Sequence, residues 1–160
     1  PIGAEIIPGL ELYGCYTREE VFTLVGRQTA EVKMQGTASG AFNLPEHNAV
    51  LLFVTLNKSE KDFSPSTQYN DYLINDEYFH WQSKNTDSHY NSGGRKYIEQ
   101  PKTGIKIILF VRDEKKDGFG NTSPFHCFGL VDYISSHDDC PMNVKWKLQK
   151  PAMAQYLKAI

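Results

Sequence analysis

Amide, basic and aromatic side chains gather after the two most apolar segments of this chain, 51–56 and 105–112. Amides and arginine can pair with the edges of DNA bases, and lysines can bind phosphates. Tyrosine and histidine rings can stack on an extruded base or pack on sugars. We therefore predict a contact set for double-stranded DNA that comprises Asn57, Lys58, Lys61, Tyr69, Asn70, Tyr72, His80, Gln82, Ser83, Lys84, Arg95, Lys96, Arg112, Lys115 and Lys116.

A structural explanation competes with this prediction for several side chains. Any single lysine can be a solvated surface charge balanced by a neighbouring carboxylate. Phe79 and Trp81 can equally be core residues, and His80 can be a buried histidine that hydrogen-bonds to a backbone carbonyl. These alternatives stay open at the level of sequence.

The overall charge argues against a protein that binds DNA as a histone does. Lysine and arginine total 17 against 19 aspartates and glutamates, which gives a net charge of −2. DNA binding therefore requires a local basic face. Each apolar run is shorter than the ~18 residues of a membrane span, and no signal peptide is recognisable, so we expect a cytoplasmic chain without a membrane partner.

The cysteine pattern bears on cross-links and metal sites. Cys15, Cys127 and Cys140 are odd in number and widely spaced, which argues against a disulfide framework and against structural zinc.

The first residue bears on the origin of the chain. The start at Pro1, without an initiator methionine, suggests a piece of a longer protein or a trimmed chain.

Catalytic patterns are weak. Glu31 and Lys33 have the spacing of a metal-dependent nuclease, which we keep as an alternative function. The segment 137–140 and the pair His126-Cys127 contain metal-ligand types, but adjacent ligands do not easily share one tetrahedral centre. The segment 92–94 lacks the lysine of a phosphate-binding loop. We expect no enzymatic activity and no cofactor.

The hydrophobic pattern predicts a mainly β domain. A helix is expected at 16–26, with a capping box formed by Thr17 and Glu20 and a stop at Gly26. A polar loop at 84–94 should lead into a helix near 95–100, and Pro151 should open a C-terminal helix at 152–160. Strands are expected at 31–34, 41–43, 49–56, 72–74, 78–82, 105–112, 125–134 (with Gly129 at a bulge or a close backbone approach) and 143–148.

These elements predict a single domain spanning residues 1–160. Most connections are too short for a helical crossover, so the strands should be mostly antiparallel. The fold class is mainly β with short helices (α+β), and the simplest architecture is an open barrel of about seven strands.

Several ordered motifs carry a resemblance to a known family. These motifs are Leu56-Asn57-Lys58-Ser59, Asp62-Phe63-Ser64-Pro65, Tyr69-Asn70-Asp71-Tyr72, Phe79-His80-Trp81-Gln82-Ser83, Tyr97-Ile98, Leu109-Phe110-Val111-Arg112, Lys115-Lys116, Phe128-Gly129, Tyr133, Pro141-Met142 and Trp146. Through them the chain, from about Tyr13 to the C-terminus, resembles a bacterial domain family of unassigned function found C-terminal to helicase and phospholipase-D-type nuclease domains. The segment 36–47 departs from the family pattern, and motor and nuclease motifs are missing here, so neither activity is carried over.

The resemblance implies a DNA-handling role in bacterial restriction or defence. A nuclease that works with a motor needs a module that reads its target, and restriction systems use DNA-binding pseudobarrels of the plant B-three type or modified-base readers. By this fold-level analogy we expect sequence recognition of double-stranded DNA, with the helicase or nuclease domains of the same polypeptide as partners. A protein-interaction module that docks the helicase motor is a further alternative.

Overall fold

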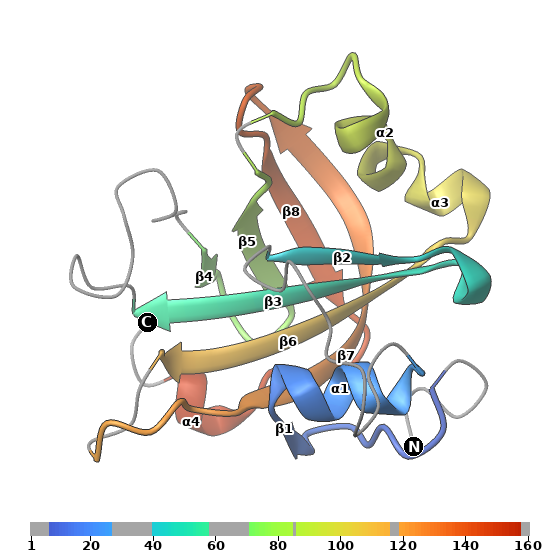
Figure 1. Ribbon diagram of the computed structural model, residues 1–160. Helices are drawn as coiled ribbons and strands as arrows, with labels where there is room; N and C mark the ends of the chain where they lie inside the picture. Colours follow the sequence, from blue (N-terminus) through green and yellow to red (C-terminus); the bar gives the residue numbers. More distant parts are fainter. Residues whose placement is uncertain (1–6, 27–39, 58–70, 85, 116–118, 158–160) are drawn as a thin grey trace.

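The chain folds into one mixed sheet with short helices around it (Figure 1). The computed structural model describes residues 7–26, 40–57, 71–84, 86–115 and 119–157. Within these ranges the helices are α1 (Arg18–Leu24), a 3₁₀ turn η1 (Pro45–His47), α2 (Ser92–Ile98), α3 (Gln100–Thr103) and α4 (Ala154–Leu157). The strands are β1 (Cys15–Tyr16), β2 (Ala41–Leu44), β3 (Ala49–Asn57), β4 (Tyr72–Leu73), β5 (Tyr78–Gln82), β6 (Lys106–Glu114), β7 (Phe125–His137) and β8 (Asn143–Leu148).

The sheet has the strand order β2-β3-β6-β7-β8-β5-β4, with β1 paired to β7. All strand pairs in the described part of the chain are antiparallel except β3 with β6, which run parallel. The predicted mainly β class with short helices and mostly antiparallel pairing is therefore confirmed. The parallel pair was not predicted; the connection between its strands contains α2 and α3, as a parallel crossover usually does.

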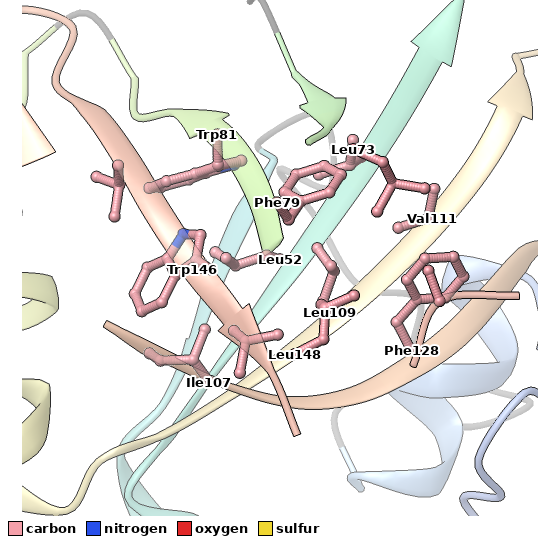
Figure 2. Close-up of a cluster of buried hydrophobic side chains, with 14 of the residues drawn as sticks. Leu52, Leu73, Phe79, Trp81, Ile107, Leu109, Val111, Phe128, Trp146 and Leu148 are labelled. Atoms are coloured by element: carbon pink, nitrogen blue, oxygen red, sulfur yellow. The ribbon is translucent and has the colours of Figure 1, made fainter. Parts of the chain in front are cut away.

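Strands β3 and β6 are buried on both faces. Leu51 and Phe53 pack into a cluster beneath α1, whereas Leu52 and Val54 point to the larger cluster on the opposite face. Figure 2 shows side chains of this larger cluster, with Trp146 and Trp81 from β8 and β5 facing residues of β3 and β6. The sheet thus carries one core on each side of its centre.

Strand β7 bends the sheet so that β5 and β8 cross β3 and β6 at a steep angle (Figure 1). Its register shifts opposite Leu109 and Phe110, where Gly129 has a φ of 84° that favours glycine. The predicted bulge at Gly129 is confirmed. Beyond Val131 the β6 pairing ends, and the backbone N–H of Tyr133 donates instead to the side chain of Gln100 at 3.0 Å.

The predicted helix ends are most accurate at α1. Helix α2 begins at Ser92, inside the loop predicted at 84–94, and α4 begins at Ala154, two residues later than predicted. The capping box of Thr17 and Glu20 forms, and Gly26 has a φ of 78° directly after the C-cap. The prediction was wrong at Tyr16, which belongs to β1, because its two-residue strand has no pattern of its own. In the described ranges, every helix is too short or too polar to cross a bilayer. The strand predicted at 31–34 lies outside the described residues.

Candidate nucleic-acid interface

One face of β4, β5, β8 and the end of β7 is made of polar and aromatic side chains. On these strands the side chains of Leu73, Phe79, Trp81, Val144 and Trp146 all enter the larger core. The alternating positions therefore point away from it. We call these positions the outer face, and they are Tyr72, Tyr78, His80, Gln82, Asp132, Ser135, His137, Asn143, Lys145 and Lys147.

The registers arrange the outer face in three rows across the strands. The middle row runs from Tyr72 through His80 and Lys145 to Ser135, so it spans four strands. Neighbouring strands lie about 4.8 Å apart, which makes this row about 14 Å long. The other rows are Gln82, Asn143 and His137, and Tyr78, Lys147 and Asp132.

Aromatic rings occupy the β4–β5 end of the outer face. Tyr72 is 45% exposed, and its ring stacks on His80 with centroids 4.5 Å apart and an interplanar angle of 16°. This stack leaves His80 only 9% exposed, so Tyr72 presents the accessible ring. Phe79 and Trp81 lie in the core, so of the two explanations given for them above, core packing is the correct one.

Hydrogen bonds fix the side-chain amides of Gln82 and Asn143, which share one row of the outer face. Gln82 Nε2 donates to Asn143 Oδ1 at 3.1 Å, and Asn143 Nδ2 donates to Asp138 Oδ2 at 3.1 Å. The backbone N–H of Gln82 donates to the carboxylate of Asp71 at 2.9 Å. Both amide planes are thereby oriented before any ligand arrives.

Two lysines on β8 give the outer face its positive charge. Lys145 is half-buried, with its ammonium 4.6 Å from the centroid of the Tyr78 ring, and Lys147 is exposed. Asp132 shares the row of Lys147, but it accepts hydrogen bonds from the side-chain amides of Gln100 and Gln149. These neutral donors disperse part of its charge.

Three predicted cations lie beyond the outer face, near α2. Lys96 donates to Asn43 Oδ1 on β2 at 3.0 Å, and burial lowers its pKa although Asp87 opposes that shift. Lys84 follows β5 and is exposed, and its charge acts on both Asp87 and Lys96. Arg95 bonds Glu99 through Nη2 at 2.7 Å and keeps about half of its side chain exposed.

Arg112 is held inside the fold. It is only 5% exposed, and its Nε donates to Thr55 Oγ1 at 2.8 Å while Nη1 donates to the Ser123 carbonyl at 3.2 Å. Its guanidinium also lies 4.3 Å from the centroid of the Phe125 ring. These contacts support a structural role, so we do not include Arg112 in the proposed contact surface.

Ser83 has a structural role too. It is fully buried, its N–H donates to the Met142 carbonyl at 2.9 Å, and its Oγ accepts from the Met142 N–H at 2.9 Å. It therefore ties the end of β5 to the start of β8.

The remaining predicted contact residues either lie off the outer face or fall outside the described residues. Lys115 is half-buried after β6, where its carbonyl accepts from the N–H of Ser123. Asn57 ends β3, and its side chain is outside the described part of the structure. The predictions for Lys58, Lys61, Tyr69, Asn70 and Lys116, and those for Glu31 and Lys33, fall outside the described residues. The structure thus brings together Tyr72, His80 and Gln82 from the predicted set, and adds Asn143, Lys145 and Lys147.

A series of hydrogen-bonded side chains lies at the edge of the outer face, and the sequence did not predict it. His89 Nδ1 lies 2.7 Å from Asp139 Oδ1, and its Nε2 lies 2.7 Å from Ser136 Oγ, which is 2.7 Å from the Tyr133 hydroxyl. The backbone N–H of His89 donates to the same Asp139 oxygen at 2.7 Å. These two hydrogen bonds lower the pKa of Asp139.

A comparison with protein families finds a match that covers most of the chain. The family model described as "Domain of unknown function (DUF3427)" matches residues 10–159. No curated protein matches the chain.

Proposed function

We propose that this chain, which belongs to the family described as "Domain of unknown function (DUF3427)", recognises double-stranded DNA through its outer face. In this proposal it is a non-enzymatic reader that positions a bacterial restriction or defence protein on its target. The bent sheet acts as a half-closed pseudobarrel, and the outer face is the side that meets the duplex.

The observation that carries the proposal is the composition of the three rows. They combine an exposed aromatic ring, two fixed amides and two lysines, over an area about 14 Å across. The major groove of B-DNA is about 12 Å wide, so a patch of this size matches one groove and its flanking phosphates.

Each row has a separate task in the complex. Lys145 and Lys147 meet phosphates, which orients the protein and makes the affinity depend on salt. Gln82 and Asn143 present amides of the kind that bond adenine through its N6 and N7 atoms. Their mutual hydrogen bond fixes their direction, which reduces the entropy lost on binding.

Selection from a randomised duplex library, with the chain at two salt concentrations, tests the proposal. We expect one recovered motif, and a Gln82→Ala variant should lose discrimination at one base position by about 1–3 kcal/mol. Gln155→Ala is the matched control, because Gln155 is an exposed glutamine on α4, outside the three rows.

Other outcomes point to other functions. A salt-dependent affinity without a motif would leave phosphate binding alone and would refute base reading. If the chain shows no salt-dependent affinity for duplexes, DNA recognition is refuted and the protein-interaction alternative gains. Mg²⁺-dependent cleavage that is lost in Glu31→Ala would identify a nuclease instead.

A further inference from the structure

The loop between β5 and α2 exposes an aromatic side chain at its tip. Tyr90 is 88% exposed, which is unusual for a large ring on a folded protein. The loop rises above the sheet at the top of Figure 1, just before α2. It starts directly after Gln82 and is anchored to Asp139, two residues beyond His137, so it lies at the edge of the outer face.

Hydrogen bonds fix the residues on both sides of Tyr90, although Tyr90 itself is exposed. His89, next to Tyr90, is held to Asp139 through both its backbone N–H and its ring, and to Ser136 through Nε2. The other side is closed by Asn91, whose Oδ1 accepts from the N–H groups of Ser88 and Gly94 at 3.2 and 3.0 Å. Tyr90 is therefore presented on a fixed support and does not need to be ordered on binding.

The residue types in this support also occur in hydrolases, where serine, histidine and aspartate form a nucleophilic triad. Two features favour a positioning role here. The Asp139 side chain is 39% exposed, so water weakens its electrostatic interaction with the His89 ring. The same Asp139 oxygen accepts the backbone N–H of His89, which uses the carboxylate to fix the loop.

A cation contacts the backbone of the residue that precedes the exposed ring. Arg95 Nη1 donates to the carbonyl of His89 at 3.2 Å, so the guanidinium lies against the residue that precedes Tyr90. About half of this arginine side chain is exposed, and Glu99 holds its other edge. An aromatic tip next to an arginine suits a nucleobase with its neighbouring phosphate.

We propose that Tyr90 stacks on an unstacked base at the edge of the bound duplex, while Arg95 contacts the adjacent phosphate. The proposal rests on the proposed function and adds a second contact site to the outer face. Stacking of a base on an aromatic side chain is lost when the ring is truncated to alanine, so Tyr90→Ala should bind about 5- to 140-fold more weakly.

The test uses the selected duplex with 2-aminopurine placed at successive positions, because this base fluoresces more strongly when it is unstacked. Wild-type protein should raise the fluorescence at one position, and Tyr90→Ala should abolish that rise and weaken binding. Tyr90→Phe should preserve both signals, because it keeps the ring. Phe119→Ala is the matched control, since Phe119 is 92% exposed on the turn between β6 and β7.

The role of the His89 ring is tested separately with His89→Ala. This variant keeps Tyr90 but removes the ring contacts with Asp139 and Ser136. This variant should weaken binding and lower the 2-aminopurine signal without abolishing either. If Tyr90→Ala binds as wild type does while outer-face variants bind weakly, the stacking proposal is refuted and DNA recognition stands. If the wild-type chain has no affinity for duplexes, both proposals are refuted.

Discussion

The two lysines of β8 lead to a quantitative prediction about salt. Lys145→Gln combined with Lys147→Gln removes two phosphate contacts, if the outer face meets the DNA backbone. Each contact contributes about 0.9 to the slope of log affinity against log salt, so the slope should become shallower by about 1.8. Between 50 and 200 mM salt, the affinity of wild type should therefore fall about 12-fold more than that of the double variant.

The double variant should remain folded. Lys147 is exposed, and Lys145 loses mainly its contact with the Tyr78 ring, which is worth about 0.5–1 kcal/mol. Urea unfolding measures this cost, and fluorescence anisotropy with the selected duplex measures the slope.

A control separates position from overall charge. Lys102→Gln combined with Lys106→Gln removes the same charge from α3 and the start of β6, outside the three rows of the outer face. Its salt slope should equal that of wild type. Equal changes in both double variants, or an unchanged slope in the β8 variant, would refute the placement of the DNA on this face.

Further predictions concern stability and pH. Arg112→Ala should lower the free energy of unfolding by about 3 kcal/mol in urea titrations, because the buried Thr55 hydroxyl and the part-buried Ser123 carbonyl lose a charged donor, and the salt slope should stay unchanged. Gly94→Ala should cost about 2–3 kcal/mol in the same assay, because a Cβ there would lie 2.0 Å from the Ser88 carbonyl oxygen. The depressed pKa of Asp139 means that its contribution to stability is complete above the ordinary carboxylate range and disappears as the pH falls through the lower, folded-state pKa. The protection factor of the His89 amide against hydrogen exchange, taken relative to the intrinsic rate at each pH, should fall over that acidic range in wild type, and Asp139→Asn should show no such fall.

The strands that were predicted most accurately are those with a clear local pattern. Strands β5 and β8 have the predicted boundaries because their side chains alternate between core and surface, as in 143–148. The strand expected at 49–56 forms β3, whose apolar run lies between the two cores. The pairing of β3 with β6 was not predictable in the same way, because it joins residues far apart in the sequence and depends on the whole sheet.

The part of the candidate site that could be predicted is the part fixed by the alternation of side chains between the two faces of a strand. Once Phe79 and Trp81 are in the core, His80 and Gln82 must lie on the opposite face. Arg112 was misleading because β6 is buried on both sides, so a polar residue at its end gives no sign of its direction. The link between His89 and Asp139 depends on tertiary structure, and the only local signal for the exposed Tyr90 was one aromatic residue in a polar loop.

The parallel pairing of β3 and β6 constrains how the molecule can form. Residues 49–57 must pair with residues 106–114 before either core is complete. The chain therefore loses the conformational entropy of closing the long connection between these two strands early in folding. Such high contact order is typical of slow folding. Because both strands contribute to both cores, a chain cut between them should yield two fragments that acquire stable structure only when mixed.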